Sequence, residues 1–346
     1  MFVYVGSRTT RHRNARGKGI SVYKVINNNW ELIQEEQVMD NPSYLTFDKT
    51  SKFLYCVHGD LSHASAYRIL QNGKLSFINT VDIGGKNPVF ITTNKTNKFI
   101  FIATLQGGSI VTLEILSDGS ISAPLHIKKL DAIGTNGITH AHQCILDKQE
   151  KCLLVPTQGR HIGYERVYVF KVNDETGELI QTCAVNSRQY SEPRHIAISG
   201  CNKRAYLINE KGNAVTYYDF DANNALLTPL QILPSLPETY TGEGQASAIL
   251  VHPNNKFVYA SNRIHESIVT YRINEQTGFL TTLGYTDVLG KTPRFMTFDT
   301  QAENLLVANE DSDVINIFKI NLETGSLEYK NQSISVGSPT CILIKE

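Results

Sequence analysis

An internal repeat of about 49 residues runs through the chain and restricts its fold more than any other feature. The first unit begins Pro42-Ser43-Tyr44-Leu45-Thr46-Phe47-Asp48 and continues, after a polar turn, with a second apolar run at residues 53–57. Equivalent units begin at Pro88, Ala141, Pro193, Ala246 and Pro293, with starts 46, 53, 52, 53 and 47 residues apart. In all six units the second run ends sixteen residues after the start. This constant length, with alternating apolar residues, predicts the same antiparallel hairpin in each unit.

A seventh unit is divided between the two ends of the chain. It starts at Pro339, 46 residues after Pro293, and stops after one strand. The N-terminal segment Phe2-Val3-Tyr4-Val5-Gly6-Ser7 matches the second strand of a complete unit, residues 99–104. Pairing the two ends would remove an open sheet edge and close a ring. We therefore expect an all-β fold: one seven-bladed β-propeller domain, residues 1–346, with four-stranded antiparallel blades and one blade shared by the N- and C-terminal strands.

The composition argues against several classes of protein. The 33 basic residues balance 33 acidic ones, so no global charge attracts nucleic acid or an anionic membrane. No window approaches the ~20 apolar residues of a membrane span, and the N-terminus lacks the order and length of a signal peptide. The six cysteines form no CxxC pair, which favours buried free thiols in a reducing compartment. We expect a cytoplasmic protein without a cofactor, and without a nucleic acid or membrane as partner.

Comparison of the units identifies candidate functional residues. The start of the first strand and the end of the second strand of each blade should meet at one mouth of the central channel. The first ring of positions, one residue after each unit start, contains Ser43, Val89, His142, Arg194, Ser247, Arg294 and Thr340. The second ring, seventeen residues after each start, contains Gly59, Leu105, Gln158, Glu210, Arg263, Glu310 and, by matching the N-terminal strand, Arg8.

Charged residues of these rings fall in consecutive blades and should form one sector. They are His142, Arg194, Glu210, Arg263 and Arg294. An imidazole, a carboxylate and several guanidinium groups suit an anionic substrate that undergoes acid/base chemistry. The alternatives are ion pairs of the arginines with Glu210 or Glu310 that tie neighbouring blades, and a buried structural role for His142. His140 and His142 lack a clear set of further metal ligands.

Other polar residues near the rings have simpler explanations. The basic loop Arg8, Arg11, His12, Arg13, Arg16 and Lys18 could cover the mouth and bind a phosphate, but a solvated loop is the simpler interpretation. We expect His195 to pack on a strand face. Asn209, Asn262 and Asn309 are expected to satisfy backbone groups of the loops.

Several short motifs follow one another in a specific order. They are Tyr4-Val5-Gly6-Ser7 with Lys18-Gly19-Ile20, His142-Gln143 before Asp147, Pro193-Arg194-His195, Asn209-Glu210, Ser261-Asn262-Arg263, and Pro293-Arg294 with Ala308-Asn309. In this order the chain resembles the lactonase-type seven-bladed β-propeller family, which includes bacterial 6-phosphogluconolactonase and the fungal 3-carboxy-cis,cis-muconate lactonizing enzyme. The resemblance spans the whole chain. Residues 155–166 depart from it, because this stretch is longer and lacks the aspartates that many relatives carry.

The resemblance implies both a reaction and a set of active-site residues. The family's proposed active-site groups correspond here to His142, Arg194, Glu210 and Arg263. The implied enzyme is a carboxylic ester hydrolase that converts 6-phosphogluconolactone to 6-phosphogluconate in the pentose phosphate pathway. Glu210 or His142 would activate water, and Arg263 would stabilise the oxyanion. Arg194, Arg294 and Arg8 would hold a phosphate or carboxylate.

Two other functions fit the same residues. Muconate lactonization also needs a base, an acid and arginines that hold carboxylates. A non-catalytic propeller that binds an anionic ligand or a protein would instead present a broad apolar or charged patch on one face. For the lactonase, the expected partner is a small anionic lactone, and the protein is expected to be a monomer or a small homo-oligomer.

Overall fold

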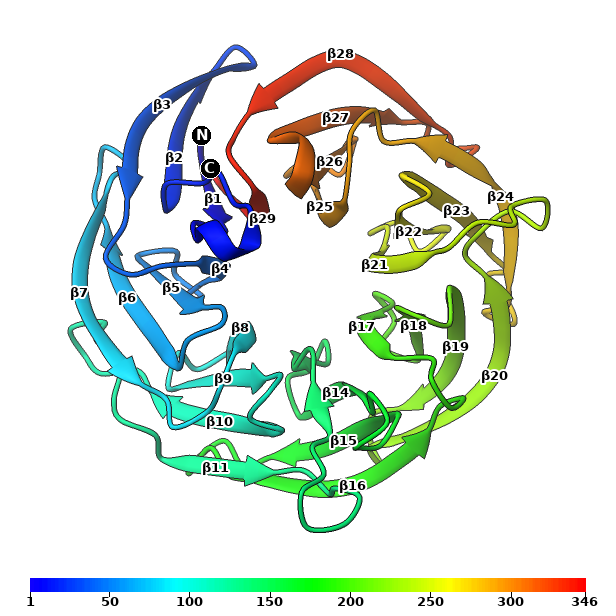
Figure 1. Ribbon diagram of the computed structural model, residues 1–346, viewed down its shortest axis with the longest axis horizontal. Helices are drawn as coiled ribbons and strands as arrows, with labels where there is room; N and C mark the ends of the chain where they lie inside the picture. Colours follow the sequence, from blue (N-terminus) through cyan, green and yellow to red (C-terminus); the bar gives the residue numbers. More distant parts are fainter.

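Seven β-sheets are arranged radially around one axis in the computed structural model, which describes residues 1–346 (Figure 1). The first strand of each sheet lines the channel and the fourth lies at the periphery. The only helical segments are two short 3-10 turns, η1 (Arg11–Arg13) and η2 (Glu310–Ser312). Neither of them has the length and apolar character that a membrane span requires.

The strands of each blade follow the chain order from the channel outwards, except that blade 1 begins with the last strand. Blade 1 contains β29 (Pro339–Lys345), β1 (Phe2–Ser7), β2 (Ile20–Ile26) and β3 (Asn29–Glu36). Blade 2 contains β4 (Pro42–Phe47), β5 (Phe53–His58), β6 (His63–Ile69) and β7 (Leu75–Asp82). Blade 3 contains β8 (Pro88–Thr93), β9 (Phe99–Thr104), β10 (Ser109–Glu114) and β11 (His126–Lys129).

The remaining blades follow the same order. Blade 4 contains β12 (His140–Ala141), β13 (Ile145–Leu146), β14 (Cys152–Gln158), β15 (Arg166–Val172) and β16 (Leu179–Asn186). Blade 5 contains β17 (Pro193–Ile198), β18 (Arg204–Asn209), β19 (Ala214–Asp221) and β20 (Leu226–Pro234). Blade 6 contains β21 (Gln245–Val251), β22 (Phe257–Arg263), β23 (Ser267–Ile273) and β24 (Leu280–Asp287). Blade 7 contains β25 (Pro293–Phe298), β26 (Asn304–Asn309), β27 (Val314–Ile320) and β28 (Leu327–Ser335).

Blade 1 closes the ring by joining the two ends of the chain. β1 pairs antiparallel with β29, from Phe2 opposite Lys345 to Gly6 opposite Cys341. The Thr340 hydroxyl donates to the Gly6 carbonyl at 3.1 Å and lies 2.9 Å from the Ser43 carbonyl of blade 2. The predicted seven-bladed fold with one shared blade is confirmed.

A β-bulge lies near the start of the inner strand in six of the seven blades, all except blade 4. In blade 2, Pro42 pairs with His58 and Tyr44 with Val57, so Ser43 between them has no partner. Equivalent register shifts occur in blades 1, 3, 5, 6 and 7. A bulge places an extra residue on one strand and changes the direction of its side chain. Apart from His142 in blade 4, the first-ring residues therefore lie at bulges at the channel mouth.

The inner strand of blade 4 differs from the other six because it is broken into β12 and β13. Residues 142–144 lie between these two strands, opposite Val155 and Pro156 of β14. Pro156 has no N–H to donate to a neighbouring strand, which weakens the ladder at this point. The His142 N–H still donates to the Pro156 carbonyl at 3.1 Å. His142 thus projects from an interruption in the sheet rather than from a regular strand.

Four of the six cysteines are buried, and all six are free. Cys183 is partly exposed and Cys201 is exposed. The expectation of free thiols is confirmed, but the expectation that they are buried is wrong for Cys201. This residue lies in the turn between β17 and β18, where the chain is at the surface.

Aromatic side chains tie neighbouring blades together through glycine turns. The hydroxyl groups of Tyr4, Tyr206 and Tyr259 donate to the carbonyls of Gly73, Gly278 and Gly325 in the next blade, at 2.8, 2.9 and 2.9 Å. Each of these glycines has a positive φ in the turn between the third and fourth strands. The turn therefore needs glycine for its backbone conformation. It also needs glycine because an aromatic ring of the preceding blade packs directly against it.

Gly73→Ala should lower the free energy of unfolding by about 1–3 kcal/mol through overpacking, with a further contribution from strain at its φ of +81°. A Cβ at Gly73 would lie 2.2 Å from the Phe2 ring. Gly134 also has a positive φ, of +66°, but a Cβ there meets nothing within 4 Å. Denaturant unfolding should therefore show a smaller loss for Gly134→Ala, and equal losses would contradict a packing role for Gly73.

Candidate active site

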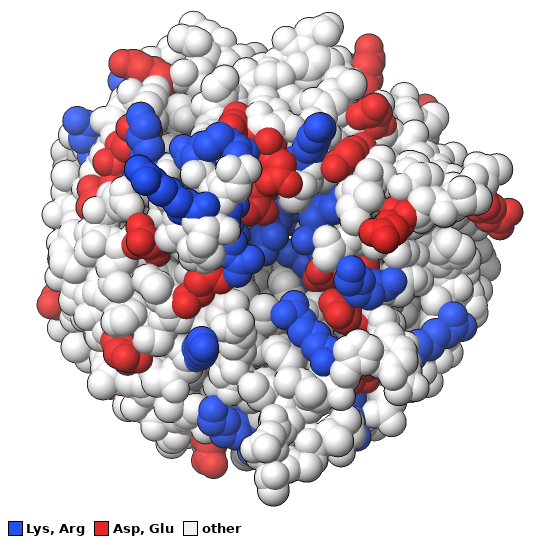
Figure 2. Space-filling model, viewed as in Figure 1, with Lys and Arg blue, Asp and Glu red and all other residues white.

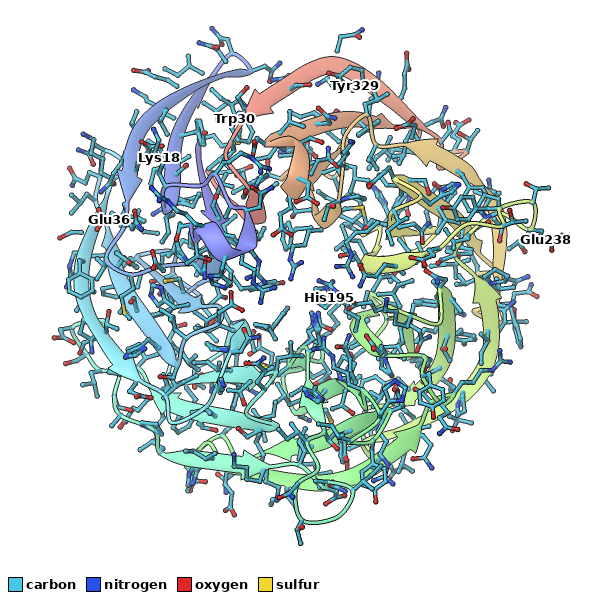
Figure 3. All side chains as sticks on the ribbon, in the orientation of Figure 1. Lys18, Trp30, Glu36, His195, Glu238 and Tyr329 are labelled. Atoms are coloured by element: carbon cyan, nitrogen blue, oxygen red, sulfur yellow. The ribbon has the colours of Figure 1, made fainter.

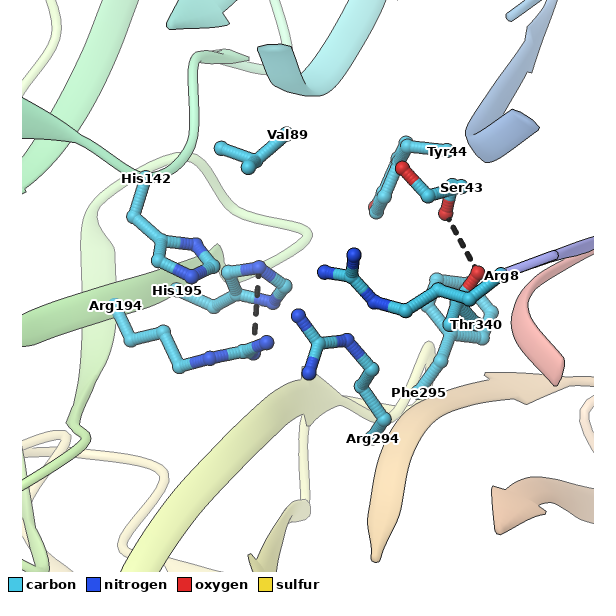
Figure 4. Close-up of a pocket in the computed structure, with 10 residues that line it drawn as sticks. All are labelled: Arg8, Ser43, Tyr44, Val89, His142, Arg194, His195, Arg294, Phe295 and Thr340. Atoms are coloured by element: carbon cyan, nitrogen blue, oxygen red, sulfur yellow. Dashed lines mark hydrogen bonds between the residues drawn. The ribbon is translucent and has the colours of Figure 1, made fainter. Parts of the chain in front are cut away.

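A small cavity of about 20 Å³ opens at one mouth of the central channel (Figure 4). Its lining residues are Arg8, Ser43, Tyr44, Val89, His142, Arg194, His195, Arg294, Phe295 and Thr340. Six of the seven first-ring residues are among them. The cavity has room for about one water molecule. On this face, Lys and Arg side chains gather around the central hollow (Figure 2).

Aromatic side chains form the floor of the cavity. Tyr44 contacts Phe90 and Phe295, with ring centroids 4.3 and 5.9 Å apart. Phe90 in turn packs against His195 at 6.0 Å. Below this floor the channel continues as a mostly apolar cavity of about 250 Å³. The floor therefore separates the polar mouth from the apolar remainder of the channel.

Glu210 is the centre of a buried ion cluster beside the cavity. Arg263 Nη2 lies 2.8 Å from Glu210 Oε1, and Arg194 Nε lies 3.2 Å from Oε2. The side-chain amides of Gln158 and Gln245 donate to the same carboxylate at 2.9 and 3.0 Å. Burial opposes ionisation of the carboxyl, but Arg263 and Arg194 outweigh it and lower the pKa of Glu210 to about 2. Glu210 is therefore a carboxylate held by two ion pairs and two amide hydrogen bonds.

Only two of the four active-site residues implied by the family resemblance lie on the cavity wall. His142 and Arg194 line it, whereas Glu210 and Arg263 do not. Arg263 Nη2 also donates to the Ala246 carbonyl at 3.0 Å. The geometry of Glu210 agrees with the structural ion-pair alternative. Catalytic roles for Glu210 and Arg263 stay predictions.

A second ion cluster holds Arg8 and Arg294 at the cavity. Glu310 lies 3.2 Å from Arg8 Nε and 3.1 Å from Arg294 Nη1. Arg8 Nη1 also contacts Asp60 at 3.0 Å, and Arg13 pairs with the same aspartate. Burial, then repulsion from Arg294, lowers the pKa of Arg8 to about 10, which still leaves the guanidinium charged at neutral pH.

The basic N-terminal loop is thus partly docked over the mouth rather than fully solvated. Arg8 is only 5% exposed. Arg16 pairs with Asp313 of blade 7, and η1 lies beside the channel (Figure 1). Arg11, His12 and Lys18 are exposed, as expected for a surface loop. Across the two clusters, five arginines face three carboxylates, so the mouth keeps a positive charge.

His142 presents an unpaired imidazole to the cavity. Its side chain makes no hydrogen bond, and Nδ1 is buried without a partner. The ring packs edge-on against His195, with centroids 5.3 Å apart. Burial and the nearby Arg194 lower the pKa of His142 well below its usual value. The imidazole is therefore neutral near pH 7 and can accept a proton.

His195 is a cavity residue that the sequence prediction missed. It was expected on a strand face, but it points toward the channel (Figure 3). The bulge at Arg194 brings the arginine and the following histidine to the same cavity, with Arg194 Nη1 3.4 Å from His195 Nε2. The repeat carries a signal for this, because three of the six equivalent positions hold the large aromatics Tyr44, Phe90 and Phe295.

The three asparagines at the ends of second strands satisfy backbone groups, as expected. Asn209 donates to the Ala214 carbonyl at 3.0 Å and Asn262 to the Ser235 carbonyl at 2.7 Å. Asn309 lies 3.5 Å from the Val288 carbonyl. No three histidine, cysteine or carboxylate side chains come together as a metal-binding group.

A family model described as "Lactonase, 7-bladed beta-propeller" matches residues 2–344. The chain belongs to the seven-bladed β-propeller lactonase family. The resemblance seen in the motifs is confirmed, and the expectation of a lactonase-type enzyme agrees with this family.

Members of this family with similar sequences include two bacterial 6-phosphogluconolactonases. The protein from Formosa agariphila is 28% identical, and the match covers 98% of each chain. The protein from Bacillus subtilis is 26% identical, over 88% of this chain and 87% of its own. The crystal structure of a candidate 6-phosphogluconolactonase from Bacteroides fragilis superposes with a TM-score of 0.88 at 27% identity, covering 100% of this chain and 98% of its own.

Proposed function

We propose that this protein hydrolyses a phosphorylated sugar lactone, with 6-phosphogluconolactone as the leading substrate. The main observation is that a neutral, unpaired imidazole and three arginines line the same cavity. The relatives from Formosa agariphila and Bacillus subtilis, both named 6-phosphogluconolactonase, support the same substrate. The substrate is a small anion, which the positive mouth of the channel would attract. The cytoplasmic location, the oligomeric state and the absence of other partners stay predictions.

In this proposal His142 is the general base. The lactone would lie in the open mouth of the channel, because the cavity itself has room for only about one water molecule. This water attacks the lactone carbonyl, and His142 accepts its proton as the C–O bond to the water forms. The tetrahedral intermediate then expels the ring oxygen, which takes the proton from the imidazolium. The products are a carboxylic acid, ionised at neutral pH, and a free hydroxyl group. Glu210 is the poorer base here, because two ion pairs and two amide hydrogen bonds occupy its carboxylate, whereas no group bonds to the His142 ring.

Arg194 is the residue best placed to stabilise the oxyanion. It lines the cavity beside His142, whereas Arg263, which the resemblance suggested for this role, does not. Glu210 and the Ser247 carbonyl, 2.8 Å from Arg194 Nη1, hold the guanidinium in place before the substrate arrives. Donors that are fixed in advance stabilise developing charge without reorganisation.

The phosphate is assigned to Arg8 and Arg294. Both guanidinium groups point into the cavity, Arg8 from blade 1 and Arg294 from blade 7 (Figure 4). Their ion pairs with Glu310 and Asp60 occupy only part of their five N–H groups each. The remaining N–H groups can bind phosphate oxygens.

The substrate assignment is tested by turnover of freshly generated 6-phosphogluconolactone, corrected for its spontaneous hydrolysis. Glucono-δ-lactone, which lacks the phosphate, is the matched control. We expect rapid turnover of the first and a much higher KM for the second. Equal turnover of both lactones would exclude a phosphate site, and acceleration of neither would overturn the proposed substrate and point to muconates and other lactones.

Arg294→Gln should raise the KM for the phosphorylated lactone about 10–100-fold. This is the fold-change in affinity expected when one hydrogen bond to a charged group is lost. The glutamine can still contact Glu310, which keeps its bond to Arg8. The KM for glucono-δ-lactone should change little, because that substrate has no phosphate. A similar increase for both lactones would place Arg294 at the reacting carbonyl instead.

The pH profile should identify His142 as the base. Because burial and Arg194 lower its pKa, the imidazole stays neutral, and able to accept a proton, below the usual histidine value of 6.5. The acid limb of kcat/KM should therefore lie below pH 6.5, with the rate falling only as the imidazole becomes protonated. An acid limb above pH 6.5 would contradict this assignment.

A further inference from the structure

A second pocket, of about 180 Å³, lies between blades 4 and 5, away from the channel cavity. We call it the inter-blade pocket. Its lining residues are Asn186, Ser187, Arg188, Ser191, Asn209, Gly212, Ala214, Thr216, Tyr218, Pro229 and Ile232. It shares no residue with the cavity that contains His142.

The pocket lies where blade 4 has a smaller side chain than four of the other blades have. In six of the seven blades, the residue after the outer strand donates its N–H to the carbonyl of the residue before the third strand of the same blade, which makes these positions equivalent. This residue is Ile83, Leu130, Val288 or Val336 in four of the blades, and each of these is buried. In blades 4 and 5 the same position holds a serine, Ser187 and Ser235. At Ser235 the Asn262 side chain crosses the gap between the blades, whereas the gap at Ser187 is left unfilled.

A missing hydrogen bond marks the same gap. Asn262 donates across the corresponding gap to the Ser235 carbonyl at 2.7 Å. Asn209 instead turns back to its own hairpin, where it donates to Ala214 O and to Thr216 Oγ1, both at 3.0 Å. The Oδ1 atoms of all three strand-end asparagines lack partners, so the absent bond across the gap is what distinguishes Asn209.

The lining offers several hydroxyl and amide groups that have unused hydrogen-bonding capacity. Ser187 Oγ and Asn209 Oδ1 are buried without a hydrogen-bond partner. Such groups are destabilising unless a ligand or water pairs with them. Thr216 Oγ1 accepts a bond from Asn209, which leaves its own proton free to donate.

The rest of the lining selects against a charged or a wholly apolar ligand. Pro229 and Ile232 form an apolar side, and no carboxylate lines the pocket. Arg188, the only charged lining residue, is exposed. The volume equals that of about six water molecules. Water would satisfy the polar groups but gain little against the apolar side, whereas a sugar offers both hydroxyl groups and an apolar C–H face.

We propose that the inter-blade pocket binds a neutral polyhydroxylated molecule of monosaccharide size. Hydroxyl groups of the ligand would pair with Ser187 and Asn209, and its C–H face would pack on Pro229 and Ile232. The pocket adjoins Glu210 through Asn209, its neighbour in sequence. The site does not depend on the lactonase reaction, and it is tested without measuring turnover.

The test uses D-glucose as the probe, with saturation-transfer NMR and crystal soaking of the full chain. Wild type should give a saturation-transfer signal, and electron density for the sugar should appear between blades 4 and 5. Ser187→Val should abolish both, because valine occupies the equivalent position in blades 6 and 7 and should fill the gap. His142→Ala should keep the signal, because it alters only the channel cavity.

A second variant keeps the test decisive if Ser187→Val folds poorly. Thr216→Val removes one hydroxyl group while keeping a similar shape, and Val111 and Val269 occupy the equivalent positions in blades 3 and 6. We expect it to weaken glucose binding at least about tenfold, a difference of about 1.4 kcal/mol. Undiminished binding in both variants, or a wild-type pocket that contains only water after soaking, would overturn the proposal.

Discussion

His142→Ala should lower kcat for 6-phosphogluconolactone by about 10² to 10⁴, the usual contribution of a positioned general base. The expected effect is on kcat more than on KM, because the proposal assigns the phosphate to Arg8 and Arg294. The imidazole makes no hydrogen bond in the structure, so its removal should leave the fold intact. Steady-state kinetics, together with a thermal unfolding curve, measure the two effects separately.

His126→Ala is the matched control for this change. His126 lies on β11 at the periphery, where it bonds to the Thr176 carbonyl at 3.0 Å, and its loss should leave kcat unchanged. A loss smaller than about tenfold for His142→Ala would remove this residue from the role of base, for which at least about 10² is typical.

Glu210→Gln should destabilise the protein by about 3–5 kcal/mol, the cost of removing one partner from a buried ion pair. The substitution leaves Arg194 and Arg263 buried without their counter-charge. Denaturant unfolding should show the loss, and Glu238→Gln, an exposed glutamate at the periphery (Figure 3), should show none. Loss of kcat with unchanged stability would instead support Glu210 as the base.

The stability of the wild-type protein in acid should depend on the ionisation of the Glu210 carboxyl group. The folded-state pKa of Glu210, about 2, lies below its usual value of 4.5. Its contribution to stability is therefore complete above pH 4.5 and is lost as the pH falls toward 2. Glu210→Gln should unfold with less pH dependence in this range than wild type, and identical pH dependence would contradict the assignment.

The fold could be predicted because the repeat carries the same hydrophobic pattern seven times. A pattern of period two specifies strands, and its division between Phe2–Ser7 and residues 339–344 specifies the ring closure. The site position could be predicted for a related reason. Some blades carry a charged residue where other blades carry an apolar or small one, such as Val89 or Ser43. Such a charged residue cannot serve the structure common to all blades, so it indicates a site.

The arrangement within the site was less predictable, since it depends on geometry that the pattern does not encode. A bulge changes which side chains face the channel, so His195 reaches the cavity although alternation along a regular strand would turn it away. The break in the inner strand at His142 follows from Pro156 on the neighbouring strand. The number of donors around Glu210 depends on Gln158 and Gln245, which come from two other blades.

Ring closure also has a consequence for biosynthesis. Arg8 follows β1, and Thr340 on β29 reaches the Gly6 carbonyl across 334 residues of chain. Both side chains line the cavity. During translation, the cavity wall therefore stays incomplete until β29 has left the ribosome and paired with β1. A nascent chain whose other six blades have already folded still lacks a finished cavity, so activity at the proposed site would report that synthesis has passed β29.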